Sequence, residues 1–327
     1  MPIGGLYQFF ANLFSYPSAT EEETKEKLKE TDSSSSETTN VVCSQTVTDK
    51  VQRKKNTGIG DLVKEYMKDV SCHREKEEDA MKLVKALEAY STSFTLPSGE
   101  RILIRPILPT DKFVMKQLIE EGAISQQSLS LRFNAVVTRV FDSVLDYFCN
   151  VNYDSHFAVS VLMEENGEWK GVASGRFIQD ETCPSEAEWA ALVVDAKHGH
   201  KIGSCILYYL GYMSHQFGIE QLMAVVHPNN YCVLYWMNKL SAYRVVKDEC
   251  YYWAFKTPLY EEWIKNPEIR KKLESASSGH GELPEELEQV VLKHVLNLST
   301  YSESDSRCDY YLNSKRHLVR SPISDEK

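Results

Sequence analysis

Residues 195–204 combine the types and spacing that can hold a phosphate group. The segment lies between an apolar stretch that reads as a strand and one that reads as a helix. Successive backbone N–H groups at such a turn, together with the positive end of a helix dipole, attract anions. Gly199 and Gly203 allow the backbone to approach a ligand closely, and His200 and Lys201 add charge at the rim. Two glycines alone are a weak signal, so an ordinary strand–helix turn is the alternative.

The overall composition limits the classes of function. Lys and Arg number 37 against 47 Asp and Glu, which gives a formal net charge of −10. Broad binding to nucleic acid needs a basic face and is disfavoured, whereas a lysine-rich protein partner is compatible with this charge. No apolar run approaches the roughly 20 residues of a membrane-spanning helix. The eight cysteines contain no CxxC pair, which favours a reducing compartment, so we expect an intracellular, cytoplasmic protein.

Short apolar runs alternate with amphipathic helices across residues 94–258, where the hydrophobic pattern is densest. Asn166-Gly167 joins two alternating segments and predicts a β-hairpin. Strands interleaved with helices indicate an α/β fold, and the hairpins make its sheet mixed. The predicted strands are 101–107, 156–163, 169–178, 187–195, 219–226, 243–246 and 251–255, and the predicted helices are 111–121, 138–149, 201–217 and 231–240.

The flanks of this region differ from it in composition. Residues 1–19 form an apolar segment that either packs on the protein's own core or docks peripherally on a membrane or a partner. Residues 20–60 are rich in Ser, Thr, Glu and Lys, as in a disordered linker. Periodicity predicts helices in 61–93 and a C-terminal helical extension over 259–300. We expect residues 301–327 to form a disordered tail.

The loop resembles motif A of the GNAT superfamily of acyl-CoA-dependent N-acetyltransferases. That motif is [Arg/Gln]-x-x-Gly-x-[Gly/Ala], and His198-Gly-His-Lys-Ile-Gly203 occupies its register. The other matching segments are GERILIRPI (99–107), SLSLRF (128–133), AEWA (187–190), HPNN (227–230) and Lys239-Leu240. Together they resemble the acetyltransferase domain of bacterial protein-lysine acetyltransferases over about residues 94–257. The resemblance implies one GNAT-like acyl-CoA N-acyltransferase domain over 94–258, with acetyl-CoA as co-substrate.

The same resemblance implies roles for individual residues. Glu188 stands where the resembling enzymes carry their catalytic glutamate. Backbone N–H groups at 192–194 would polarise the thioester carbonyl. Asn230 would lie near the pantetheine arm, with an N-cap role as its alternative. The implied cofactor-binding residues are Leu192, Val193, Val194, His198, Gly199, His200, Lys201, Ile202, Gly203, Ser204 and Asn230.

A general base is required because an ammonium group has no lone pair with which to attack. The pKa of free lysine is about 10.4, so only about one molecule in a thousand is neutral near pH 7.4. A carboxylate beside the acceptor, directly or through water, can take the proton. Strand alternation puts Glu186 and Glu188 on the same face. We expect Glu188 to be the base. Glu186 is the reserve base, although an exposed charge near the strand start is the preferred interpretation of this residue.

Three positions depart from the family pattern. His198 replaces Gln or Arg, and Lys201 replaces the usual Gly. The side chain of Lys201 either crowds the pyrophosphate or pairs with it, and the sequence does not decide between these. Met237 stands where many GNAT enzymes carry a tyrosine as general acid to the leaving thiolate. His198 and His200 lack a third ligand at a convincing spacing, so we expect no metal.

These patterns predict an acetyl-CoA-dependent N-acetyltransferase that acts on a protein lysine or another primary amine. Transfer would proceed by direct attack in a ternary complex, with Glu188 as base. Two alternatives remain open: a non-catalytic acyl-CoA-binding or scaffolding module, and an acetyltransferase for small-molecule amines.

Overall fold

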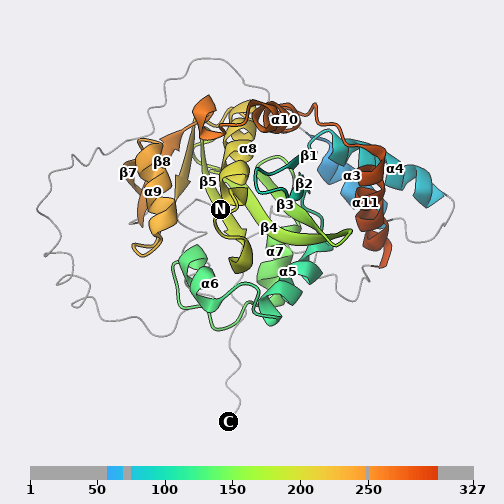
Figure 1. Cartoon of the computed structure of the whole chain (residues 1–327), viewed down its shortest axis with the longest axis horizontal. Coiled ribbons are helices and arrows are strands. Elements are labelled where there is room, and N and C mark those ends of the chain that lie inside the picture. Colours follow the sequence, from blue (N-terminus) through green and yellow to red (C-terminus); the bar gives the residue numbers. More distant parts are fainter. Residues whose placement is uncertain (1–56, 69–74, 248–249, 301–327) are drawn as a thin grey trace, which may run out of the picture.

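A computed structural model describes residues 57–68, 75–247 and 250–300. The predicted apolar segment 1–19, the linker up to residue 56 and the tail 301–327 lie outside the described residues. The described part is built on an eight-stranded sheet with the order β1-β2-β3-β4-β5-β6-β8-β7 (Figure 1). Every neighbouring pair is antiparallel except β5 and β6, which run parallel. The prediction of a mixed α/β sheet is therefore confirmed.

The strands follow the predicted alternation closely. Asn166 and Gly167 both have positive φ, 55° and 80°, as a two-residue type I′ hairpin turn requires. Only β1 was missed. The strands are β1 Thr92–Thr95, β2 Arg101–Pro106, β3 His156–Glu165, β4 Glu168–Gln179, β5 Glu186–Val193, β6 Gln221–Ala224, β7 Tyr243–Lys247 and β8 Cys250–Lys256.

The helices correct the sequence prediction at two places. The helix predicted over 138–149 begins only at Asp142. An unpredicted helix, α6, starts where Ser125 accepts a hydrogen bond from the N–H of Ser128 and ends at Asn134 in the left-handed region. The α-helices are α3 Ile59–Lys68, α4 Glu75–Glu88, α5 Asp111–Glu120, α6 Gln126–Phe133, α7 Asp142–Cys149, α8 Ile202–Gln216, α9 Tyr231–Lys239, α10 Pro267–Ser277 and α11 Glu285–Leu296.

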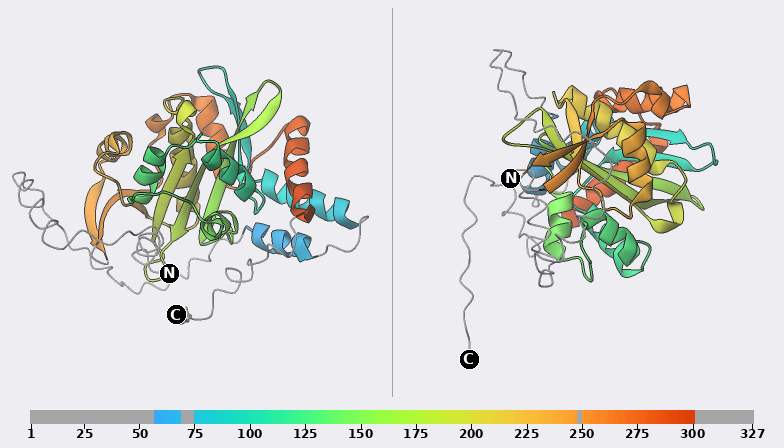
Figure 2. Two further views of the ribbon diagram at one scale, coloured as in Figure 1. Left: turned by 90° about the horizontal axis from the view of Figure 1, so that it is seen from below. Right: turned by 90° about the vertical axis from the view of Figure 1, so that its left-hand side faces the viewer.

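Helices cover both faces of the sheet (Figures 1 and 2). Gly175 in β4 faces α8 so closely that a Cβ atom there would lie 2.2 Å from Ile206. The next residue, Arg176, points to the other face and donates a hydrogen bond to the carbonyl of Phe148 in α7. Helices α5, α6 and α7 therefore cover one face, and α8, with α10 packed on it, covers the other. No helix in the described ranges is long and apolar enough to cross a membrane.

The parallel pairing of β5 with β6 is short. It joins three residues on each strand and ends at Glu188 and Met223. Beyond Glu188, β5 remains paired with β4 as far as Val193. The edge of β5 that faces β6 is therefore left without a strand partner from Trp189 onward.

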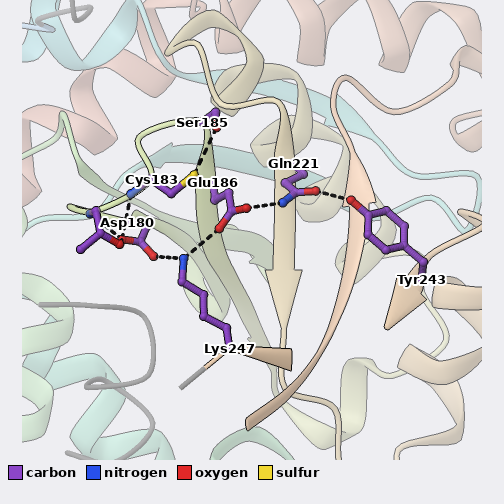
Figure 3. A network of polar contacts seen from close by, with 8 residues as sticks. Asp180, Cys183, Ser185, Glu186, Gln221, Tyr243 and Lys247 are labelled. Atoms are coloured by element: carbon purple, nitrogen blue, oxygen red, sulfur yellow. Dashed lines mark hydrogen bonds and ion pairs between the residues drawn. The ribbon is translucent and has the colours of Figure 1, made fainter. Parts of the chain in front are cut away.

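A network of polar side chains holds the paired ends of β5 and β6 together (Figure 3). Glu186 accepts hydrogen bonds from Nε2 of Gln221 at 2.6 Å and from Nζ of Lys247 at 2.8 Å. Lys247 also donates to Asp180, and the hydroxyl of Tyr243 donates to Gln221. We call these five residues the strand clamp. Because they tie β5, β6 and β7 together, the strands diverge only after Glu188.

The clamp overturns one prediction from the sequence. Glu186 was expected to be an exposed charge, but it is 9% exposed and ion-paired with Lys247. The partner lies on β7, far along the chain, so no local pattern could have indicated it.

Replacing Lys247 by Met should lower the free energy of unfolding by about 3 kcal/mol near pH 7, because two carboxylates lose their shared cation. Burial raises the pKa of Asp180, but hydrogen bonds from Lys247 and Thr182 more than offset this and hold that pKa below its ordinary value. Such a carboxylate stabilises the fold above its unfolded pKa of about 3.9 and loses this contribution as the pH falls through its folded pKa. The loss of unfolding free energy caused by the substitution should therefore become smaller as the pH falls toward about 3. Urea titrations near pH 7 and near pH 3 would measure this difference.

A matched control is Lys256→Met, which removes an exposed lysine at the end of β8. It should change stability by less than about 0.5 kcal/mol. A Lys247→Met protein as stable as the wild type near pH 7 would contradict the role of the clamp.

Candidate functional site

A cleft of about 360 Å³ opens where β5 and β6 diverge. Its walls are the second half of β5, the end of β6, the loop that leads into α8, and parts of α6 and α9. Of the predicted site residues, the cleft is lined by Glu188, Leu192, Val193, His198, Gly199, Lys201, Ile202, Gly203, Ser204 and Asn230.

Two predicted residues lie outside the cleft lining. Nδ1 of His200 lies 2.8 Å from a carboxylate oxygen of Glu100, so its side chain is directed toward the loop before β2. The backbone N–H of Val194 donates to the carbonyl of Val172 at 2.9 Å. The expectation that Val194 offers its N–H to a thioester carbonyl is therefore wrong.

The hydrogen bonds between β5 and β4 also show which N–H groups of β5 face the cleft. In an antiparallel pair, alternate residues exchange hydrogen bonds with the neighbouring strand. Because Val194 bonds to β4, Leu192 also bonds to β4, which removes a second expected donor. Ala191 and Val193 instead direct their N–H groups toward the open side of β5. Of the three donors expected from the sequence, only Val193 keeps its N–H available.

The loop before α8 has the geometry of an anion-binding turn. Gly199 and Lys201 have φ of 85° and 69°. The first α8 residue to bond back along the helix is Cys205, whose N–H donates to the carbonyl of Lys201. The N–H groups of residues 202–204 therefore precede the helical ladder, at the positive end of the helix dipole. Among the described residues, no hydrogen bond or ion pair engages the ammonium of Lys201, which leaves it available to an anion.

Gly203 is required by the close packing of α8 against α9. A Cβ atom on Gly203 would lie 2.8 Å from the indole of Trp236 in α9. Nε1 of Trp263 donates to the carbonyl of Ser204 at 3.0 Å, and the two indoles meet edge to face with their centroids 6.0 Å apart. The first turn of α8 is thus held in place by the two indoles.

Glu188 is the acidic group of the cleft. Its Oε2 is shielded from solvent and has no hydrogen-bond partner. Burial raises the pKa of Glu188 to about 7, although the positive charge of Arg132 partly opposes this rise. A carboxyl group with such a pKa is close to half ionised at neutral pH, where a general base works best.

Helix α9 carries the remaining predicted residue, Asn230. Its side chain accepts a hydrogen bond from the N–H of Val233 at 3.2 Å, so the N-cap alternative is confirmed, and Asn230 also lines the cleft. Met237 is fully buried, whereas Tyr235 is 58% exposed and outside the cleft lining. No described tyrosine therefore takes the position of an acid to a leaving thiolate.

Cys205 lies near the start of α8, close to the anion-binding turn. Cys205 is buried, and burial raises the pKa of its thiol to about 12. In the described ranges, no group of three or more His, Cys, Asp or Glu side chains could hold a metal ion.

The sequence prediction missed the residues that α6 brings to the cleft. Arg132 and Phe133 line it, and Asn134 donates through Nδ2 to the carbonyl of Val225 at 3.0 Å. The helix is fixed to the end of β5 because Ser128 donates to Asp195 at 2.7 Å. The SLSLRF match was a signal for these residues, but it gave no indication of their position.

No family model matches the chain. Over 151 residues it is 29% identical to the acetyltransferase Pat from Mycolicibacterium smegmatis, which covers 46% of this chain and 44% of that protein. Among solved structures, the GNAT domain of S. lividans PAT covers 51% of this chain and 97% of that one, with 20% identity and a TM-score of 0.45. The chain resembles the GNAT protein acetyltransferases. The resemblance inferred from the motifs is confirmed, although the chain matches less than half the length of the Pat relative.

A further structural neighbour is yncA from Salmonella typhimurium, solved with its cofactor acetyl-CoA. It is 14% identical, covers 49% of this chain and 95% of its own, and has a TM-score of 0.37.

Replacing Lys201 by Gly tests the position at which the chain departs from the GNAT pattern. The change removes a side chain from the left-handed region, which should stabilise the fold by about 1 kcal/mol. It also removes a free ammonium from an anion-binding turn, so we expect the Kd for acetyl-CoA to rise about fivefold in low salt. The difference in Kd between the wild type and Lys201→Gly should become smaller at about 0.5 M salt, because screening weakens an exposed ion pair. Calorimetric titration measures both Kd values.

Lys201→Arg is the matched control because it keeps the charge and the backbone strain. Its Kd should stay within about twofold of the wild type. Tighter binding by Lys201→Gly would instead show that the side chain crowds the ligand.

Proposed function

We propose that this chain is an acetyl-CoA-dependent N-acetyltransferase whose acceptor is a protein lysine or a similar primary amine. The carrying observation is a half-buried carboxylate, Glu188, whose pKa lies near 7 and which lines the cleft between the diverging strands. The anion-binding turn before α8 lines the same cleft. The sequence match to acetyltransferase Pat supports the assignment.

The chain's own groups can hold each part of acetyl-CoA. The N–H groups of residues 202–204 and the ammonium of Lys201 would bind the pyrophosphate. The unpaired edge of β5 would accept the pantetheine arm, because amide groups of the arm can replace the missing strand. The N–H groups of Ala191 and Val193 would donate to the thioester carbonyl oxygen as negative charge develops on it.

Glu188 would supply the proton transfer. It takes a proton from the acceptor ammonium, directly or through a water molecule, and the neutral amine then attacks the thioester carbon. A C–N bond forms and the C–S bond breaks. The attacking nitrogen releases its second proton to solvent, and CoA leaves as a thiolate that takes up a proton from solvent. Met237 cannot donate a proton, and a thiol with a pKa of about 8.5 can leave without a dedicated acid.

Replacing Glu188 by Gln should lower kcat/KM for acetyl transfer by about 10²- to 10³-fold near pH 7.5, because the amide cannot accept the proton. In the wild type, kcat/KM should rise with pH through a midpoint near 7, because Glu188 must be ionised to act. The variant should lose this midpoint. Thiol release from acetyl-CoA in the presence of a lysine peptide library measures both profiles.

Glu168→Gln is the control, because it removes an exposed carboxylate at the start of β4 on the same sheet. It should keep the wild-type pH profile. Equal turnover by Glu188→Gln and the wild type would reject the assigned base.

Glu188→Gln should also stabilise the protein at alkaline pH. A carboxyl group whose pKa is raised in the fold opposes folding once the pH exceeds its unfolded pKa of about 4.3. The cost approaches about 3 kcal/mol above pH 7, and Gln avoids it. The gain in unfolding free energy should therefore appear near pH 8.5 and vanish near pH 4.5, as guanidinium titrations would show. A variant less stable than the wild type at pH 8.5 would contradict the raised pKa.

A further inference from the structure

A second, smaller cavity lies beneath α5, α6 and α7, directly beside the cleft. Its volume is about 50 Å³, and it shares Arg132, Phe133 and residues 190–192 of β5 with the cleft lining. Most of its walls are apolar, but five of the side chains that line it are polar. One of them, Asp111, is ion-paired with Arg105. The other four, as shown below, have no carboxylate partner: Arg132, Arg176, Ser160 and Ser174.

The strand register brings three of these groups to the face that carries Glu188. Ser160 lies opposite Ser174, and Arg176 lies opposite Ala190. Glu188 lies two residues before Ala190, so its side chain points to the same face of the sheet as Arg176. Arg132 comes from α6, which covers this face. The cavity therefore adjoins the reacting end of the cleft.

Arg176 is 4% exposed and has no acidic partner within ion-pair distance among the described residues. Its Nη1 donates to the carbonyl of Phe148 at 2.8 Å and lies 3.5 Å from Nε2 of His156. Its guanidinium lies over the Phe148 ring at 4.1 Å. No hydrogen bond to a described residue occupies Nε or Nη2.

Arg132 is also without a carboxylate partner. Its guanidinium lies 5.2 Å and 5.7 Å from the ring centroids of Phe133 and Phe148, and no described residue accepts a hydrogen bond from it. The hydroxyls of Ser160 and Ser174, both more than nine-tenths buried, have no hydrogen-bond partner in the described chain either. Donors from two strands and a helix thus line one cavity, and no described carboxylate pairs with them.

The neighbouring charges do not neutralise these two arginines. Asp111 is engaged by Arg105, and Asp146 by Lys112. Burial and the charge of Arg176 lower the pKa of His156 well below its ordinary value, so this ring is neutral. Glu188 remains, and it makes no ion pair with either arginine. A buried guanidinium without an anion costs several kcal/mol, and burial together with Arg132 lowers the pKa of Arg176 to about 9.

We propose that Arg132 and Arg176, assisted by the hydroxyls of Ser160 and Ser174, bind a carboxylate carried by one of the two substrates. This inference rests on the acyl transfer of the proposed function and redefines one of its two substrates. The carboxylate would be either the far end of a dicarboxylic acyl thioester, such as a succinyl group, or the acid group of a small amino-acid acceptor.

The size of the cavity limits the ligand. A cavity needs a volume of about 10–15 Å³ to hold one water molecule. The volume of about 50 Å³ found here therefore holds a carboxylate with one or two methylenes. A long aliphatic chain does not fit. The bond-forming step is unchanged, because the carboxylate is bound and does not react.

The donor test compares thioesters of equal chain length. Calorimetric titration should show that the wild type binds succinyl-CoA at least about tenfold more tightly than butyryl-CoA, because only succinyl carries the charge. Arg176→Gln should bring this ratio close to one, and Arg176→Lys should retain part of it. Arg244→Gln removes an exposed arginine on β7 and should leave the ratio as it is.

The acceptor test holds acetyl-CoA constant. Amino acids of increasing length, among them β-alanine and 4-aminobutyrate, are compared with their carboxamides by kcat/KM. A preference of at least about tenfold for the acids, lost in Arg176→Gln, places the carboxylate on the acceptor. A preference in the donor test places it on the acyl group instead.

Ser174→Asp gives a readout that does not depend on Arg176→Gln folding. The new carboxylate would lie between the arginines, so the variant should melt at a higher temperature than Ser174→Asn and should lose charge selectivity in both tests.

If acetyl-CoA binds but neither test shows a preference for the acid, the inference is wrong. If acetyl-CoA does not bind, the proposed function fails, and direct titration with succinate then decides. If succinate binds to the wild type and Arg176→Gln abolishes this binding, the carboxylate site is supported. If succinate does not bind to the wild type, the carboxylate site is overturned.

Discussion

The early end of the pairing between β5 and β6 is the constraint on which the site depends. Three paired residues and the strand clamp hold the strands together up to Glu188. Beyond that point the backbone groups on one edge of β5 have no strand partner, and unpaired backbone groups away from water are costly. A ligand with its own amides can satisfy them, so the same divergence creates the cleft and favours an extended occupant.

The two faces of β5 contribute different parts of the site. Trp189 and the residues that alternate with it face α8, whose first turn supplies the free N–H groups. Glu188 faces α5, α6 and α7, where burial keeps its pKa near 7. The anion-binding turn and the base therefore belong to different layers of the fold. The distance between the turn and Glu188 is fixed by β5 alone, because the register of this strand sets the positions of both the turn and the base.

The sequence predicted those parts of the structure that depend on local pattern. Asn166-Gly167 identified its hairpin because only residues that tolerate positive φ fit that turn. Helix α6 was missed because its stability depends on a cap at Ser125 and a contact with Asp195 across the fold. Likewise, Arg176 reads as an ordinary strand residue, and a periodic pattern does not distinguish a solvated arginine from one buried over Phe148.

The base and the two arginines are electrically coupled because they share one buried face. The positive charge of Arg132 opposes the effect of burial on Glu188, so the pKa of the base depends on what else lies in that layer. An anion bound between the arginines would screen Arg132 and remove part of this opposition. Glu188 would then become a stronger base when the carboxylate is in place. Substrate recognition and proton transfer would in this way be linked through a single helix residue, without movement of the strands.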